Sequence, residues 1–449
     1  MPMNFQRVVA PATMTMAAAC ALLTVGAVQA ADQEPPKTPT SISYEADVAF
    51  LLKEFETQAG RLLKVKGVDW DAVKVEFTEA AKNVKTDEEH LKLVMRLTGK
   101  LRDGHAGLRN SKVKWPDESQ GRKYSGPGVL LLVSEGKVYV SAAYDRVAEQ
   151  GMGPGTEVVK IDGVPVLEWL RKRAKEKQDE GSGYSTEHQA LYAACHWGLA
   201  GWDGSTITFE TKDAATGETR EVKLTRSGGT NYVPSGRLYN PVDRKRAGRQ
   251  TYGKTAEGYG YIHLRDVPGD LPLQLDQMLK DLGDVRGLIL DVRANGGGGC
   301  DHEAVFGRFL ARGQTWKQYT SAGDNPFSGP MVVIVDAGVR SAGETIGGMF
   351  KEDGRAYMIG DAPTAGTSSQ KSEVTTPSGL FTIRFSVSSN KGRFNGGRGI
   401  EGIGVLPHEI VSMKADDLRK REDTEVKRAV ELLQKGFPKG VVEYGGKWE

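Results

Sequence analysis

The sequence predicts an α/β protein built around a largely parallel β-sheet, on three observations. From about Gly258 onward, short apolar runs alternate with amphipathic stretches of helical period. Two of these runs, Gly287–Val292 (GLILDV) and Met331–Asp336 (MVVIVD), are apolar apart from one Asp near the end of each, as strands buried on both faces are. Glycine-rich or turn-like segments follow both runs, where the loops of such a sheet bind ligands. Strand–helix–strand repeats of this kind are typical of a parallel sheet covered by helices.

Length and composition limit the classes of function. The 449 residues are enough for two or three domains, and an apolar content of 39% can fill more than one core. The formal net charge is only +2, and Lys and Arg are spread among Asp and Glu. The sequence has no basic block with interleaved aromatic residues, so nucleic acid is not an expected partner. No period of 20–50 residues repeats, which argues against a solenoid or propeller.

The N-terminus has the pattern of a bacterial secretory signal peptide over residues 1–30. One positive side chain and no acid come first, then a long uncharged stretch, then small residues up to Ala30. Cleavage is expected after Ala30, giving a periplasmic or secreted protein without a membrane span. A membrane anchor is disfavoured because the strongly apolar part is short of a ~20-residue span. A lipoprotein modified at Cys20 is disfavoured because the apolar run continues past it.

Four regions follow the signal peptide. Residues 31–42 form a Pro-rich polar linker, and residues 43–111 have helical periodicity. Residues 124–227 are rich in β-strand patterns and carry a helical insertion at 167–201. The α/β core is expected over 250–412. A charged helix and tail, residues 413–449, end the chain.

Two loops leave the expected carboxyl edge of the parallel sheet. One holds Gly296–Gly299, whose glycines suit either phosphate binding by backbone N–H groups or an oxyanion hole. The other, DAGVRSAGE, places Ser341 at the start of a helix. Ser341 is either an ordinary N-cap, completed by Glu344 three residues on, or a nucleophile facing helix N-terminal amides. The spacing Gly-x-x-Ser-x-Gly differs from the Gly-x-Ser-x-Gly of α/β-hydrolases, which disfavours that fold.

A serine nucleophile needs a base, and His105 is the first candidate. It lies in Asp-Gly-His, in a glycine-flanked turn after a helix, where a side chain can project into a cleft. A histidine in a surface turn is the ordinary alternative. His302 and His408 also lie in polar contexts.

Metal and disulfide chemistry have weak support. His302 stands between Asp301 and Glu303, but no His-Glu-x-x-His or Cys-x-x-Cys spacing accompanies it. No metal or cofactor is therefore expected. Cys195 and Cys300 remain after the signal peptide, and they either pair in an oxidising compartment or stay free thiols.

Five motifs, in order along nearly the whole mature chain, resemble the tail-specific (C-terminal processing) serine peptidase family, nearer its tricorn-like branch. They are LRDGHAGL (101–108), a PDZ-like segment (126–226), GLILDVRANGGG (287–298), VDAGVRSAGETIGGMF (335–350) and GIEGIGVLPHEIV (399–411). Each motif alone is weak, and five in order are strong. The resemblance implies a ClpP/crotonase-like parallel-sheet protease core with an N-terminal helical region and an inserted PDZ-like β domain.

The resemblance also implies roles for individual residues. Ser341 would be the nucleophile, His105 the general base and Glu401 the acid that orients the histidine. Three backbone N–H groups would form the oxyanion hole, those of Gly297, Gly298 and Ala342. In the PDZ-like unit, a peptide would bind by strand addition at Gly128, Val129 and Leu130. The closing motif has His408 where the family usually has Asp.

The best-known processing proteases of the family use a Ser–Lys dyad instead. Here the place of that lysine falls at Gly366, and Lys371 is displaced from it, although Gln370 resembles a polar partner of the dyad. We therefore favour Ser–His over Ser–Lys. In tricorn-like sites a serine precedes the histidine, whereas this chain has Gly104.

The sequence as a whole predicts a secreted or periplasmic serine endopeptidase that cleaves unfolded or tail-exposed proteins through an acyl-enzyme. Its partners would be peptide or protein substrates, and the oligomeric state is left open. A peptide- or lipid-binding relative without activity is one alternative, and a Ser–Lys protease using Lys371 is another. A nucleotide-binding enzyme that uses the glycine loop is the third.

Overall fold

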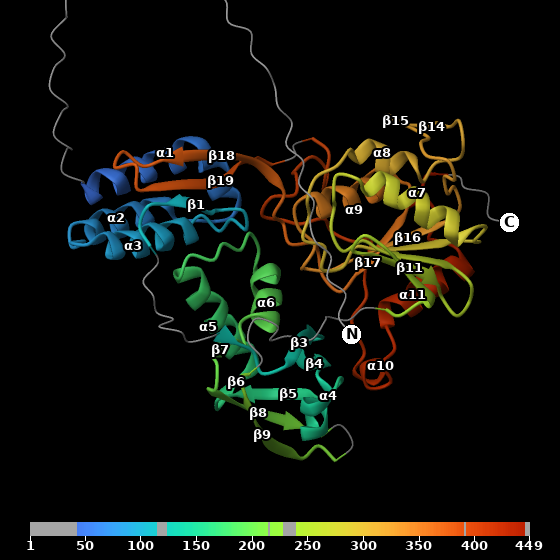
Figure 1. Ribbon diagram of the computed structural model, residues 1–449, viewed down its shortest axis with the longest axis horizontal. Helices are drawn as coiled ribbons and strands as arrows, with labels where there is room; N and C mark the ends of the chain where they lie inside the picture. The colour runs from blue at the N-terminus through green and yellow to red at the C-terminus, as the bar shows by residue number, and fades with distance from the viewer. Residues whose placement is uncertain (1–42, 115–123, 214–215, 228–238, 390–391, 445–449) are drawn as a thin grey trace, which may run out of the picture. The chain divides into compact units, whose positions relative to one another are not determined.

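The computed structural model describes residues 43–114, 124–213, 216–227, 239–389 and 392–444 (Figure 1). The expected signal peptide and linker lie outside these described residues. All described residues belong to one compact unit. Among them, no helix is long and apolar enough to cross a membrane.

A seven-stranded sheet forms the core, in the order β10-β11-β12-β13-β16-β17-β20. Its strands are β10 (Val242–Ala247), β11 (Gln250–Lys254), β12 (Gly260–His263), β13 (Leu288–Asp291), β16 (Met331–Val335), β17 (Tyr357–Gly360) and β20 (Glu409–Ile410). From β12 to β20 all neighbours are parallel, and β10 and β11 add an antiparallel edge. The largely parallel sheet predicted from the sequence is confirmed.

Helices cover both faces of this sheet, which explains why its central strands are apolar throughout. The helices are α7 (Leu271–Leu282), α8 (His302–Gly307) and α9 (Ala342–Glu352) on one face and α11 (Thr424–Lys435) on the other (Figure 1). Leu288 and Leu290 pack with the first set, whereas Ile289 between them packs with α11. A small hairpin, β14 (Thr315–Trp316) and β15 (Tyr319–Thr320), and helix α10 (Ala415–Arg419) complete the region.

The N-terminal helical region packs on a separate three-stranded sheet. The helices are α1 (Tyr44–Val65), α2 (Trp70–Ala81) and α3 (Asp87–Gly99), and the strands are β1 (Gly107–Ser111), β19 (Phe381–Ser389) and β18 (Ser369–Thr375). The sequence assigned the β18–β19 hairpin to the α/β core, but its apolar side chains lie in one cluster with those of α1, α2 and α3. Because β1 pairs with β19, the turn before β1, which carries His105, is joined to this hairpin.

Residues 124–227, called the insertion unit below, form a mixed β and α layer. Its elements are β2 (Tyr124–Ser125), β3 (Val129–Ser134), β4 (Lys137–Ala143), α4 (Asp145–Val147), η1 (Ala148–Met152), β5 (Glu157–Ile161), β6 (Val164–Pro165), α5 (Val166–Asp179), α6 (Glu187–His196), β7 (Gly201–Trp202), β8 (Thr206–Lys212) and β9 (Thr219–Thr225). The main sheet runs β3-β4-β5-β8-β9, with β6 on β5, so β3 is an edge strand. Helix α6 packs against β3.

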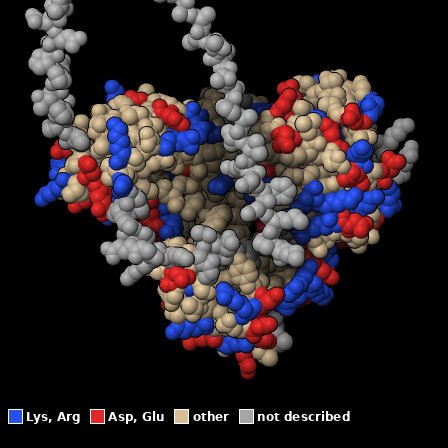
Figure 2. All heavy atoms as spheres, in the orientation of Figure 1, with Lys and Arg blue, Asp and Glu red and all other residues tan. Residues whose placement is uncertain are grey.

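The charge pattern agrees with the sequence expectation. Figure 2 shows acidic and basic side chains interspersed over the face it displays, and that face is hollowed at its centre. Cys195 is buried in the insertion unit, Cys300 lies against the core cluster, and both are free thiols.

Candidate active site

Ser341 occupies a strained turn between strand β16 and helix α9. Its backbone has φ 57° and ψ −129°, which is unusual for a residue with a side chain. Two contacts hold the turn: the Ser341 amide donates to the carbonyl oxygen of Thr367 at 2.8 Å and to Oε2 of Glu344 at 3.1 Å. A serine on a sharp, strained strand-to-helix turn is the geometry that exposes a nucleophile.

Glu344 does more than complete a helix cap. It is fully buried, and its two carboxylate oxygens also accept hydrogen bonds from Thr364 Oγ1 and from the amides of Gly366 and Thr367. Burial raises the pKa of Glu344 to about 8 despite these bonds. One carboxyl group therefore fixes the serine turn and residues 364–367 to each other.

The glycine loop packs directly against this turn. Gly297 has φ 85°, and a Cβ there would lie 2.6 Å from Cβ of Ser341 and 3.2 Å from the amide nitrogen of Ala342. At Gly298, with φ 146°, a Cβ would lie 2.1 Å from the carbonyl oxygen of Val267. Only glycine fits at both positions, because each demands a positive φ and a close approach of backbone.

The three amides predicted to form an oxyanion hole differ in their partners. The amide of Gly297 donates to Oδ1 of Asn295 at 2.8 Å. For the amides of Gly298 and Ala342, the described residues provide no acceptor. The amides of Gly298 and Ala342 therefore differ from that of Gly297 in having no acceptor among the described residues.

His105 lies in the turn between α3 and β1, and two carboxylates lie close to it. One atom each from Asp103, His105 and Glu401 lie within 4.8 Å of one another. The amide of His105 donates to Oδ1 of Asp103, which is itself held by Ser386. Among the described residues, Nδ1 of His105 and Oε2 of Glu401 are both buried without a hydrogen-bond partner.

The electrostatics of the pair differ from those of free side chains. Burial, and then the positive charge of Lys371, lower the pKa of His105 to about 4, so its imidazole is neutral at neutral pH. Burial raises the pKa of Glu401 to about 7, although the ammonium of Lys66 opposes that rise. Nζ of Lys66, at the end of α1, lies 2.7 Å from Oε1 of Glu401, and both side chains are buried.

Other groups already contact two of the three side chains in this cluster. In the part of the chain that the structure describes, Asp103, His105 and Glu401 are the one group of such residues close enough to share an ion. Lys66 already provides a positive charge at Glu401, and Ser386 occupies both oxygens of Asp103.

The position expected for a dyad lysine cannot carry one. Gly366 has φ +74°, and a Cβ there would lie 2.6 Å from Cγ2 of Thr186 and 2.9 Å from the amide of Gly404. Lys371 lies further along strand β18, where burial and Arg384 lower its pKa. Its neighbour Gln370 accepts a hydrogen bond from Ser388.

The other predicted candidates lie elsewhere. His408 binds the backbone of Met358, which places it in the β17 ladder, and burial lowers its pKa to about 4. His302 begins helix α8, where Asp301 is the N-cap. Neither belongs to the cluster around His105.

A cleft of about 910 Å³ leads to the glycine loop. Gly296, Gly297 and Arg340 line one side of it, and the insertion unit provides much of the rest, including Leu130 and Tyr192. Two of the positions predicted to bind a peptide, Gly128 and Val129, immediately precede or begin the edge strand β3.

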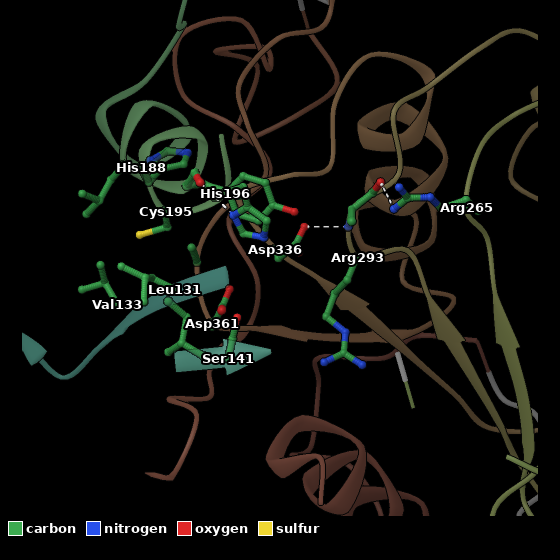
Figure 3. Close-up of a pocket in the computed structure, with 16 residues that line it drawn as sticks. Leu131, Val133, Ser141, His188, Cys195, His196, Arg265, Arg293, Asp336 and Asp361 are labelled. Carbon is green, nitrogen blue, oxygen red and sulfur yellow. Dashed lines mark hydrogen bonds between the residues drawn. The ribbon is translucent and has the colours of Figure 1, made fainter. Parts of the chain in front are cut away.

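A second cavity, of about 360 Å³, lies between β3, α6 and the carboxyl edge of the core sheet. Figure 3 shows Leu131 of β3 and Cys195 of α6 on its apolar walls, and Asp336 and Asp361 on the side of the core. The edge strand and helix α6 thus border a groove that adjoins the candidate site.

Local sequence signals found only part of this site. Ser341, His105 and the glycine loop lie in short motifs, and Glu344 was visible as the end of a capping box. Lys66 and Ser185, which both contact Glu401, come from distant segments that carry no local signal.

Comparison with known proteins finds a family match over the core and several relatives of low identity. Residues 258–411 match peptidase family S41. Tricorn protease homolog 2 of Streptomyces coelicolor is 24% identical over 88% of this chain and 34% of its own length. A carboxyl-terminal-processing protease of Picosynechococcus is 26% identical over 47% of this chain and 50% of its own. The chain therefore spans about a third to a half of the length of these relatives.

Comparison with solved structures shows which fold this chain resembles. The crystal structure of mature CPAF has a TM-score of 0.65 and 16% identity, covering 89% of this chain and 98% of that one. A likeness at this identity concerns the fold, a mixed α/β arrangement with a parallel sheet. The predicted resemblance to the tail-specific peptidases is confirmed: residues 258–411 of this chain match peptidase family S41.

Proposed function

We propose that the chain is a serine endopeptidase in which Ser341 is the nucleophile and His105 the general base. Ser341 attacks the scissile carbonyl carbon, and His105 takes the hydroxyl proton and later gives it to the leaving amine. The resulting acyl-enzyme is hydrolysed by water. The observation that carries this proposal is the pair of buried, unpartnered atoms, Nδ1 of His105 and Oε2 of Glu401. A bond between them would orient the ring and stabilise the imidazolium.

The oxyanion of the tetrahedral intermediate would form beside the glycine loop. The amides of Gly298 and Ala342 are the first donors we assign, since the amide of Gly297 already binds Asn295. Gly297 contributes by its lack of a side chain, because a Cβ there would reach Ser341. Donors aimed at the developing charge commonly lower the barrier more than any other single contribution.

The insertion unit supports the proposal that the substrate is a peptide. We infer that it acts as a PDZ-like domain within a ClpP/crotonase-like protease. An extended chain would add to the edge strand β3 at Gly128, Val129 and Leu130, with α6 on its other side. Such binding suits unfolded proteins or exposed chain ends. The signal-peptide pattern of residues 1–30 supports an activity in the periplasm or outside the cell.

Hydrolysis of casein and labelling by a fluorophosphonate test the proposal together. We expect the purified protein to do both, Ser341→Ala and His105→Ala to lose casein hydrolysis, and Lys371→Ala to keep it. An inactive Lys371→Ala beside an active His105→Ala would assign the base to the lysine. A wild-type protein that neither cleaves nor labels would instead be a binding relative of the family.

A further inference from the structure

Ser185 binds the catalytic acid from the insertion unit. It lies between α5 and α6 and is 1% exposed. Its hydroxyl donates to Oε1 of Glu401 at 2.9 Å and accepts a hydrogen bond from the amide of Gly104 at 3.0 Å. The Oγ1 of Thr367 donates to it at 3.1 Å. One donor and two acceptor sites are all that a hydroxyl has, so Ser185 is fully engaged.

The beginning of helix α6 strengthens this connection. Oε1 of Gln189 accepts from the amide of Ser185 at 2.6 Å and lies 3.1 Å from Oγ1 of Thr367. Thr186 donates from its hydroxyl to the carbonyl oxygen of Ala365 at 2.8 Å. Thr367 in turn accepts the Ser341 amide, so α6 is two hydrogen-bonded steps from the nucleophile.

We propose that Ser185 is a positioning residue for Glu401 and His105, a proposal that rests on the function proposed above. Ser185 and Lys66 both bind Oε1 of Glu401, which leaves Oε2 for Nδ1 of His105. The same hydroxyl holds the amide of Gly104, the residue before the histidine. Ser185 thus holds both of the segments that would form the acid–histidine bond.

A side chain at position 104 would displace the groups that surround this hydroxyl. A Cβ on Gly104 would lie 2.6 Å from Oγ1 of Thr367 and 2.9 Å from Nε2 of Gln189. The group that binds Glu401 therefore comes from a residue 81 positions further along the chain. The catalytic acid is held correctly only when the α5–α6 segment is docked on the core.

A double-mutant cycle between Ser185→Ala and Glu401→Gln tests the proposal on peptide hydrolysis. We expect Ser185→Ala to lower kcat about 10- to 100-fold, the worth of a hydrogen bond to a charged group, with KM within about twofold. Because the lost bond favours the ionised carboxyl, the acid limb of the pH profile should move to higher pH. In the Glu401→Gln background, Ser185→Ala should change kcat by less than about twofold, since both act through one contact.

Ser378→Ala is the matched control, because it also removes a serine hydroxyl from a buried carboxylate, that of Asp47. It should keep kcat and the pH profile of the wild type. Effects of Ser185→Ala and Glu401→Gln that multiply, or an unchanged kcat and pH limb, would overturn the proposal. If Ser185→Ala fails to fold, Ser185→Cys, of similar volume and weaker donor strength, enters the same cycle. A wild-type protein that resists the fluorophosphonate would refute the proposed function itself, which is a different result.

Discussion

Two clusters of serine, histidine and a carboxylate that lie within the described residues are arranged differently. In the first, called the buried cluster, Asp47 lies in the middle and binds both Nε2 of His90 at 3.0 Å and the hydroxyl of Ser378 at 2.5 Å. In the candidate active site, the histidine has the middle place by its proposed role. His105 would take a proton from Ser341 and bind Glu401, which lies next to it. The residue types match, so composition alone does not separate a catalytic group from a structural one.

The difference lies in the carboxylate, because both oxygens of Asp47 accept hydrogen bonds whereas Oε2 of Glu401 has no partner among the described residues. Burial alone would raise the pKa of Asp47, but hydrogen bonds from His90 and Ser378 outweigh it and lower that pKa. His90 is fully buried between the rings of Tyr44 and Phe381, so no substrate can reach its unpartnered Nδ1. The candidate site instead combines an acid of raised pKa and a strained serine with a cleft that reaches the glycine loop.

Replacing each histidine in turn should give the largest difference between the two clusters. His105→Gln should lower kcat on the order of 10⁴- to 10⁶-fold, as loss of a triad base does, with little change in melting temperature. His90→Gln should keep kcat and lower the melting temperature, because it leaves Asp47 with one partner fewer. Casein hydrolysis and thermal unfolding of both variants check this. A stable, fully active His105→Gln would remove the histidine from the mechanism.

The glycine loop offers the next largest effect. Gly297→Ala places a Cβ 2.6 Å from Cβ of Ser341, so we expect kcat to fall roughly 10²- to 10³-fold, as when an oxyanion donor is displaced. Gly299→Ala is the control, since a Cβ there meets no atom within 4 Å. Its kcat should stay within about twofold of the wild type. Equal activity of the two variants would show that the loop does not approach the reacting carbonyl.

Removal of Lys66 should give a smaller, pH-dependent effect. The ammonium of Lys66 lowers the pKa of Glu401, which burial raises to about 7. In Lys66→Met that pKa rises further, so the acid limb of kcat/KM should move to higher pH and activity near pH 7 should fall roughly three- to tenfold. Lys74→Met, at an exposed ion pair with Glu56, should leave the profile unchanged. Superimposable profiles would argue that Glu401 does not need to be ionised.

The sequence predicted the core sheet and the two loops at its carboxyl edge for a physical reason. Strands buried on both faces must be continuously apolar, and the positive φ and close approach at Gly297 admit no side chain. The prediction from the sequence misplaced the β18–β19 hairpin. The alternation in LFTIRFSV predicts one buried face, but it does not show which layer covers that face. The partner helices of that face lie some 300 residues earlier in the chain.

The contacts of Glu401 could not be predicted from the sequence, for a different reason. Glu401 itself was identified through the family resemblance, whereas Lys66 ends an amphipathic helix and Ser185 precedes one, as many surface residues do. Only the packing of α1 and the α5–α6 segment on the core brings their side chains to the carboxylate. A polar network assembled from distant segments leaves no periodic pattern in any one of them.

The smallest expected effect belongs to the buried cluster and concerns stability alone. Ser378→Ala removes a hydrogen bond from the buried carboxylate of Asp47 and should lower the free energy of unfolding by about 1–3 kcal/mol at neutral pH. The folded-state pKa of Asp47 is lowered, so its contribution is present above the ordinary value and is lost as the pH falls through the folded one. The difference between variant and wild type should therefore shrink from pH 7 toward about pH 3, as urea unfolding at both pH values would measure. A constant difference would mean that the hydroxyl contributes by packing, and a loss of casein hydrolysis would mean that the two clusters are coupled.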